Sequence, residues 1–357
     1  MPSERVALVG GTSLVGSDLD VVDDAVIVIE NGRIAAVGSS GTARVREPAT
    51  TVDTTGSLLM PGFIDAHVHI GFHPPETVLA NGVTTVRDLA WPPKVIHRLA
   101  ERSRDSAFPG PLIVAAGPML TAPGGYPTRA AWAPEGTGRV VDGPDDARAA
   151  VATTVEEGAA IIKVALNPEA GPTLDGDTLT AVVEAAHERG LKVTGHVAGL
   201  EELDKALDAG MDELAHMLMS DERIPDDTIA RMVERGLTVV PTLSVRFGGE
   251  RRTAIDNLRR FHRAGGRVIY GTDLGNAGPQ PGIDGREIRA MAAAGMTVSE
   301  IVRSATVDAA RWLGLESKGV LAEGADADIV AVSINGLDEP DGLTRVETVW
   351  RGGMRFP

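Results

Sequence analysis

The chain has 357 residues, a hydrophobic fraction of 43% and no cysteine, which suits one large globular protein whose core needs no disulfide. Its formal net charge of -16 argues against nucleic acid or an anionic membrane as a partner, because phosphate groups are bound by clustered lysine and arginine. We find no signal-like N-terminus and no run near the roughly 18 apolar residues of a membrane helix, so we expect a cytoplasmic protein.

The first 58 residues predict short strands separated by turns. The pair Asn31-Gly32, flanked by alternating apolar residues, is a strong signal for a two-residue hairpin. The segment that starts at Gly319 likewise predicts short strands separated by glycine-rich turns. We therefore predict that the chain ends, residues 1–58 and 317–357, form one small β-sandwich domain. The strands predicted in these segments span residues 5–9, 15–16, 24–30, 32–37, 57–59, 329–332 and 346–351.

Between the ends, eight short apolar segments alternate with helical patterns. Continuous apolar runs are typical of parallel strands buried on both faces. The predicted strands are 62–70, 84–89, 112–116, 160–166, 192–197, 213–217, 238–243 and 268–272. The predicted helices include 145–157, 177–189, 200–209, 226–235 and 254–264. This alternation and the count of eight predict an α/β protein with a (β/α)8 TIM barrel over residues 59–316.

The segment from Gly117 to Gly143 is the one long irregular stretch, rich in glycine, proline and alanine. A long loop in a compact domain is usually functional. We expect it to lie over the active site.

His67 and His69 end the first of the eight predicted strands. Side chains alternate faces along a strand, so both imidazoles point the same way and can hold one divalent metal. Two histidines at this spacing also occur by chance, but the segment Pro61 to His69 (PGFIDAHVH) resembles the first-strand motif of the amidohydrolase superfamily. The closing segment 319–332 also resembles that superfamily, and the branch it resembles most includes imidazolonepropionase and the prolidase-like metallodipeptidases.

Lys163 is one of only five lysines and sits among apolar residues. Burial lowers the pKa of an amine toward its neutral form, and a neutral amine can react with carbon dioxide to give a carbamate. The resemblance implies a carbamylated lysine that bridges two metals at this position. The alternative is a lysine whose amine reaches solvent at the strand end.

His196, His216 and Asp273 end later strands. Each histidine alone could be a hydrogen-bonded core residue; the resemblance implies that both bind the second metal. Asp273 could bind the first metal and accept a proton before returning it to the leaving group. The alternative, an aspartate that caps a helix, disagrees with Gly275 and the proline-rich run that follows.

Arg246 follows the seventh strand, where the loops of a barrel select substrate. It could bind a substrate carboxylate through two parallel hydrogen bonds, or it could be a solvated arginine beside Glu250. Related sequences often carry Gly-Gly-His where this chain has Gly124-Gly125-Tyr126, so no particular substrate is transferred. The other predicted substrate contacts are Tyr126, Arg129, Asn167 and His73.

These residues predict a binuclear hydrolase with two divalent ions, zinc being favoured because histidines dominate the site. A metal-bridging hydroxide would cleave the amide bond of a small molecule such as an N-acyl amino acid, dipeptide or cyclic amide. One alternative is hydrolysis of an ester, lactone or organophosphate by the same site. Another is a non-catalytic metal-binding barrel that serves as a structural or interaction subunit. The resemblance also implies a homo-oligomer.

Overall fold

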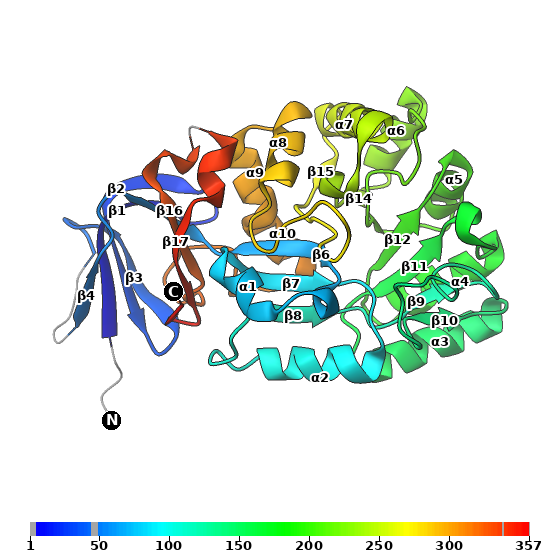
Figure 1. The fold of residues 1–357 in the computed structure, drawn as a ribbon, viewed down its shortest axis with the longest axis horizontal. Helices are drawn as coiled ribbons and strands as arrows, with labels where there is room; N and C mark the ends of the chain where they lie inside the picture. Colours follow the sequence, from blue (N-terminus) through cyan, green and yellow to red (C-terminus); the bar gives the residue numbers. More distant parts are fainter. Residues whose placement is uncertain (1–4, 44–48, 338, 357) are drawn as a thin grey trace.

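The computed structural model describes residues 5–43, 49–337 and 339–356. Figure 1 shows a sheet made by the two chain ends at one side of the molecule and parallel strands with surrounding helices at the other. The fold is α/β with parallel sheets, as predicted.

The two chain ends join in one eight-stranded sheet with the order β18-β17-β16-β5-β1-β2-β3, in which β4 pairs with β1. Its strands are β1 (Arg5–Val15), β2 (Asp20–Glu30), β3 (Arg33–Ser39), β4 (Thr50–Asp53), β5 (Ser57–Pro61), β16 (Ile329–Ser333), β17 (Val346–Arg351) and β18 (Met354–Phe356). The predicted strands 5–9 and 15–16 are one strand, β1, whose pairing with β2 shifts register around Gly11. The first part of β1 pairs with β4, which the sequence did not predict, and the later part with β5.

The predicted hairpin at Asn31-Gly32 is confirmed. It joins β2 to β3 with Glu30 opposite Arg33. Both turn residues have positive φ, 53° at Asn31 and 77° at Gly32, which is what a type I′ turn requires.

Each of the eight strands predicted in the middle overlaps an observed strand, but those predicted at 213–217, 238–243 and 268–272 are only two residues long in the structure, and the remaining residues of these segments belong to loops or to η3. One sheet has the order β6-β7-β8 and the other β10-β9-β11-β12-β13-β14-β15. Their bounds are β6 (Phe63–Val68), β7 (Val83–Asp88), β8 (Leu112–Ala115), β9 (Met119–Thr121), β10 (Gly138–Val140), β11 (Ile162–Leu166), β12 (Val193–Val197), β13 (Glu213–Leu214), β14 (Thr238–Val239) and β15 (Arg267–Val268). The strands β9 and β10 were not predicted. They form inside the segment from Gly117 to Gly143, because this loop pairs with the edge of β11.

Helices cover the outside of the parallel strands (Figure 1). They are α1 (Pro75–Ala80), α2 (Pro93–Ser103), α3 (Pro144–Glu156), α4 (Gly176–His187), α5 (Leu200–Asp208), α6 (Asp226–Glu234), α7 (Gly248–Arg263), α8 (Gly285–Ala293), α9 (Val298–Ala305) and α10 (Val307–Leu313). Single 3-10 turns are η1 (Ile70–Phe72), η2 (Pro168–Ala170), η3 (Leu243–Val245), η4 (Ile334–Leu337) and η5 (Pro340–Thr344). The helix predicted at 254–264 begins earlier, at Gly248, and the end of the strand predicted at 62–70 belongs to η1.

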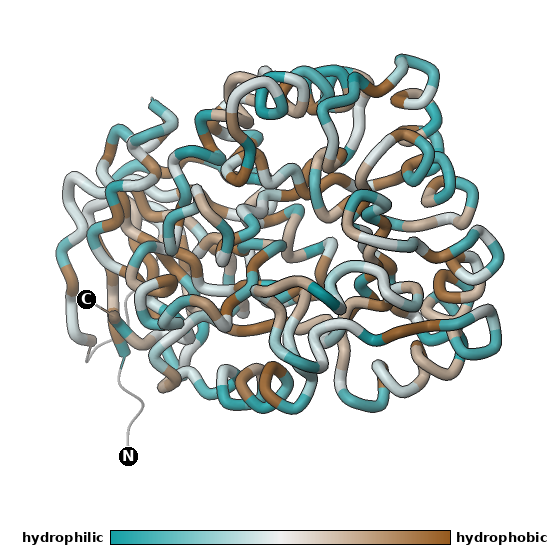
Figure 2. Tube along the Cα trace, turned by 45° about the vertical axis from the view of Figure 1, so that its right-hand side comes forward, coloured by the Kyte–Doolittle hydropathy of each residue, from teal (hydrophilic) through white to brown (hydrophobic). Residues whose placement is uncertain are grey.

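Figure 2 shows hydrophilic stretches along the outer helices and hydrophobic stretches running through the interior. The largest hydrophobic core continues from the sheet of the chain ends, at Leu14 and Leu58, into the parallel strands at Val83 and Val86. Among the described residues, no helix combines the length and apolar character that crossing a membrane requires.

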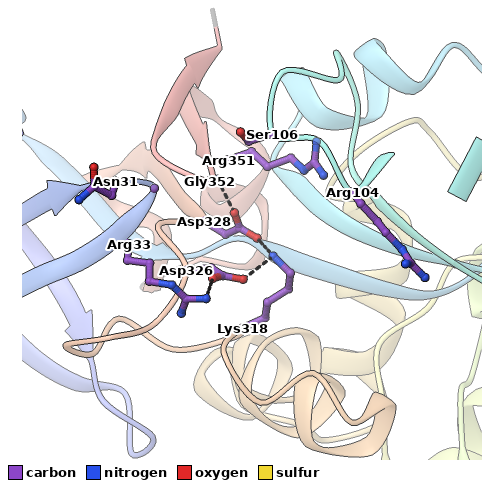
Figure 3. A pocket seen from close by; sticks show the side chains of 10 residues that line it. Asn31, Arg33, Arg104, Ser106, Lys318, Asp326, Asp328, Arg351 and Gly352 are labelled. Atoms are coloured by element: carbon purple, nitrogen blue, oxygen red, sulfur yellow. Dashed lines mark hydrogen bonds and ion pairs between the residues drawn. The ribbon is translucent and has the colours of Figure 1, made fainter. Parts of the chain in front are cut away.

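A polar junction also joins the two parts, beside a cavity of about 250 Å³ (Figure 3). Lys318 Nζ lies 2.6 Å from Asp328 Oδ2 and 3.1 Å from Asp326 Oδ2. The guanidinium of Arg351 donates to the carbonyl oxygens of Asp105 and Phe108, beyond the end of α2. These charges are therefore compensated within the protein, and we assign the junction a structural role.

Candidate metal centre

The predicted metal ligands converge in the interior of the parallel strands, and all but Lys163, the second residue of β11, lie near or beyond the carboxyl end of a strand. His67 lies in β6 and His69 follows it, Lys163 lies in β11 and His196 in β12. The remaining two, His216 and Asp273, follow β13 and β15. All six side chains are buried. Ends of parallel strands meet at one face of such a fold, which explains how residues spread over some two hundred positions reach one site.

His67, His69 and Asp273 form a group that could hold a metal ion, with one ligand atom from each within 4.8 Å of the others. The Nε2 atoms of His67 and His69 lie 3.2 and 3.3 Å from Asp273 Oδ1. Their Nδ1 atoms lie 2.7 Å from the oxygen of Ala215 and 3.2 Å from that of Ala90. Carbonyl oxygens only accept, so we assign the protons to Nδ1 and leave the Nε2 lone pairs facing Asp273.

This arrangement suits a cation. His67 Nε2 and Asp273 Oδ1 are buried and lack a hydrogen-bond partner in the part of the chain that the structure describes. Two lone pairs facing each other in a buried place are unfavourable unless a proton or a metal ion lies between them. The donor set therefore fits a divalent metal.

The second pair of histidines faces inward from the neighbouring strands. His196 Nδ1 lies 3.1 Å from His216 Nε2. The other ring nitrogens lie 2.8 Å from Thr242 Oγ1, for His216, and 3.3 Å from Asn167 Nδ2, for His196. Burial lowers the pKa of both imidazoles well below the usual range, and the nearby positive charges lower it further. Both rings are therefore neutral, the form that binds metals.

Lys163 is close enough to both groups of histidines for its charge to lower their pKa values. It is 1% exposed, and its Nζ has no hydrogen-bond partner among the residues described. The amine therefore does not reach solvent, and that alternative is wrong. Burial lowers its pKa from 10.5 to about 7, against the attraction of Asp273 and Glu213. A substantial fraction of the amine is neutral near pH 7, as carbamate formation requires.

Asp273 adopts a left-handed backbone conformation, with φ of 60°. Its N–H donates to His67 O at 2.7 Å, which ties the loop after β15 to β6. The next helix, α8, begins only at Gly285 and is capped by Asp284. The alternative that Asp273 caps a helix is therefore wrong. A buried left-handed aspartate is a strained feature of the kind that collects at functional sites.

Asp65 is a buried residue at this site that sequence reasoning missed. Its carboxylate accepts from Thr272 Oγ1 at 2.6 Å and from the N–H groups of His67 and Thr272 at 3.1 Å. Burial raises its pKa to about 7, and the hydrogen bonds with Thr272 and His67 oppose that rise. Asp65 thus fixes β6 to the segment before Asp273. Its place between Ile64 and Ala66 in a buried strand was the available signal.

The segment from Gly117 to Gly143 lies against the histidines, as predicted. Tyr126 has its ring centroid 5.1 Å from that of His196, and Trp132 lies 5.3 Å from His69 and 6.0 Å from Tyr126. With the contacts between His67, His69, His196 and His216, the six rings make a closed circuit. Trp132 was missed; an indole inside a long loop of a chain with 3% aromatic residues was the signal.

The other predicted substrate contacts divide into two groups. Asn167 contacts His196 through its side-chain amide. Arg246 is only 3% exposed, so the alternative that Arg246 is a solvated arginine is wrong. His73 is half-buried and Arg129 is exposed. Among the described residues, neither His73 nor Arg129 makes a side-chain hydrogen bond or ring contact with the four predicted histidine ligands.

Arg246 is held mainly by backbone oxygens. Its Nη2 donates to Leu218 O at 2.7 Å and to Met217 O at 3.4 Å, just beyond His216. Glu250 Oε2 lies 3.8 Å from Nη1. The guanidinium therefore supports the segment that follows the sixth of the eight predicted strands.

Comparison with known proteins gives a consistent picture. The sequence model of the Amidohydrolase family matches residues 58–355. Ochratoxinase from Aspergillus niger is 26% identical over 431 aligned positions, which cover 99% of this chain and 87% of that protein. A solved amidohydrolase structure is similar with a TM-score of 0.84 at 25% identity, over 99% of this chain and 98% of that one. A Xaa-Pro dipeptidase solved with bound methionine has a TM-score of 0.84 at 24% identity, over 99% and 100%.

Proposed function

The chain belongs to the amidohydrolase family, and from this premise we propose that it is a binuclear metal-dependent enzyme that hydrolyses an amide bond of a small substrate. Its relatives include hydrolases such as ochratoxinase. This membership supports an enzyme rather than the non-catalytic metal-binding barrel considered above.

The convergence of six buried ligand groups carries the proposal. His67, His69 and Asp273 would hold one ion, and His196 and His216 the other. Lys163, as a carbamate, would supply an oxygen to each. The carbamate would form when the lone pair of the neutral Nζ bonds to the carbon of carbon dioxide, one C=O π bond shifts its electrons to oxygen and the nitrogen releases one proton, which converts a neutral amine into an anion. Burial and the lowered pKa of Lys163 support this step. Zinc remains the predicted metal.

The protein groups around the ions would position substrate and move the proton. Bound divalent ions would lower the pKa of a water molecule and polarise the scissile carbonyl group. Asp273 would accept the proton of that water at a carboxylate oxygen and deliver it to the departing nitrogen. Burial raises the pKa of Tyr126 to about 12, so its hydroxyl keeps its proton and could donate to a substrate oxygen. Arg246 stays a predicted contact for a substrate carboxylate.

We also propose that the parallel strands close into the predicted (β/α)8 barrel over residues 59–316. Backbone hydrogen bonds from Ala66 N to Tyr270 O and from Ala160 N to Ala115 O support closure at both gaps between the two sheets. A separate hydrophobic cluster that includes Leu8, Ile27 and Trp350 supports a sandwich made by residues 1–58 and 317–357. The cytoplasmic location and the homo-oligomer stay predictions.

Metal content per chain tests this proposal, by elemental analysis of wild type and Lys163→Ala purified in parallel. Two metal ions per chain in wild type and one or fewer in Lys163→Ala would support the binuclear site. Lys94→Ala, at an exposed position on α2, is the control and should keep both ions. One equivalent in every protein would contradict the bridging role of Lys163. A substrate panel of amides, esters, lactones and phosphotriesters would separate the proposed reaction from its alternative.

A further inference from the structure

Four aromatic side chains from three separate segments meet beside the histidines. Phe72 ends η1, Trp91 follows β7, and Tyr126 and Trp132 lie in the long loop; we call this group the aromatic wall. It uses two of the four tryptophans and one of the two tyrosines of the whole chain. In a protein with 3% aromatic residues, such a concentration at one place requires an explanation.

The wall is continuous with the candidate metal centre. Phe72 and Trp91 have ring centroids 4.9 Å apart in an edge-to-face arrangement, and Phe72 lies 6.2 Å from Trp132. Trp132 in turn contacts His69 at 5.3 Å, and Tyr126 contacts His196 at 5.1 Å. These separations lie in the range at which aromatic rings attract one another. A substrate bound at the histidines would therefore lie against the wall.

The wall is only partly covered by the rest of the protein. Phe72 is 41% exposed, and Trp91, Tyr126 and Trp132 are half-buried. Core aromatic residues of this chain such as Phe63 are fully buried. Keeping apolar ring surface in water is unfavourable, so the open face is suited to a ligand that replaces this water.

The local backbone is adapted to this packing. Gly71 lies directly under the Trp91 indole, where a Cβ would collide with the ring, and a Cβ on Gly275 would meet His69 and Phe72 at 2.9 and 3.0 Å. The absence of side chains at these two positions lets the wall approach the loop that carries Asp273. The wall is thus fixed in position rather than loosely placed on the surface.

We propose that the aromatic wall selects substrates that carry a planar apolar ring next to the scissile amide bond. A flat ring would stack on or meet edge-on the exposed faces of Trp132 and Phe72 while the carbonyl group reaches the histidines. An aliphatic group of equal size would bury similar area but lose the attraction between rings. This inference deepens the proposed function and rests on it for the reaction that follows binding.

Binding to the zinc-loaded protein tests the inference without requiring turnover. N-benzoylglycine and N-cyclohexanecarbonylglycine share the same glycine amide and six-carbon ring, which is planar and aromatic in the first and saturated and puckered in the second. Trp91 and Trp132 would report binding through tryptophan fluorescence. We expect the benzoyl compound to bind about 2- to 12-fold more tightly, the range that aromatic pair energies give. Equal affinity, or tighter binding of the saturated compound, would overturn the inference.

Three variants locate the effect. Trp132→Leu should remove the preference for the benzoyl compound and Phe72→Leu should reduce it, whereas Phe356→Leu, in β18 of the sheet of the chain ends, should keep it. Circular dichroism would verify that all three variants fold. A preference that is unchanged in both Trp132→Leu and Phe72→Leu would contradict recognition of the ring by the wall.

Turnover separates this inference from the proposed function. Acetanilide and N-cyclohexylacetamide place the ring on the amine side, and the two glycine derivatives place it on the acyl side. Because the aromatic and saturated compounds differ in intrinsic reactivity, the ratio of their kcat/KM values is compared between wild type and Trp132→Leu. A ratio that falls in the variant for either pair supports the inference, and ratios unchanged in both pairs would contradict it. Preferential binding of the benzoyl compound with no hydrolysis of any amide would leave the wall as a ring-binding surface and contradict the proposed reaction.

Discussion

Replacing Lys163 by methionine is expected to stabilise the metal-free protein although it removes a metal ligand. The amine is buried and has no hydrogen-bond partner among the described residues. A pKa moved from 10.5 to about 7 corresponds to about 5 kcal/mol between the charged and neutral forms. Methionine has a similar length and no charge, so we expect the variant to gain about 3–5 kcal/mol of unfolding free energy at pH 7.

The gain should depend on pH in a defined way. Between about pH 7 and 10.5 the unfolded protein holds the Lys163 proton and the folded protein has released it. The stability of wild type therefore rises with pH over this interval. The advantage of Lys163→Met is therefore complete well below pH 7, decreases as the pH rises from about 7, and is nearly lost at about pH 10.5.

Urea unfolding of chelator-treated, bicarbonate-free proteins between pH 6 and 10 measures this difference. Lys94→Met, at an exposed position, controls for the loss of a lysine and should show no such trend. A Lys163→Met protein less stable than wild type at pH 7, or a difference constant with pH, would refute the reasoning that burial neutralises this amine.

Three further outcomes are expected. Asp273→Asn should lower kcat about 100- to 10,000-fold, because the proton acceptor is lost, with little change in melting temperature; retained activity would contradict the proton transfer. Arg87→Met should cost about 3–5 kcal/mol in urea unfolding, because Glu213, 2.5 Å from Arg87 Nη2, would stay buried without its cation. The double variant with Glu213→Leu should recover much of this loss, and a single variant as stable as wild type would contradict the estimate. For each zinc site that is filled at about 100 times its dissociation constant, the unfolding free energy of the chelated protein should rise by about 2.7 kcal/mol, and a melting temperature insensitive to zinc would argue against a preformed site.

The aromatic wall and the hydrogen bonds that orient the buried histidines and Glu213 could not be predicted from short sequence patterns. His67 Nδ1 meets Ala215 O across 148 positions of sequence. His216 is oriented by the hydroxyl of Thr242. The left-handed backbone of Thr242, with φ of 47°, cannot be predicted from the periodicity of the sequence. Glu213 sits in a two-residue strand, and its pairing with Arg87 spans 126 positions. Each of these hydrogen bonds depends on how separate elements pack, and the sequence around one partner does not indicate which residue the other partner is.

The sequence by itself determined the elements and the chemical character of the candidate site. Apolar runs, the hairpin at Asn31-Gly32 and the alternating faces of a strand act over a few residues, so the eight middle strands and the shared face of His67 and His69 were predictable. Tertiary structure decided that Trp132 closes a circuit of rings with the histidines and that Lys163 lies 1% exposed with no hydrogen-bond partner among the residues described. Burial and electrostatic environment are properties of the packed fold, and they set the pKa of Lys163 and the surface that a substrate would meet.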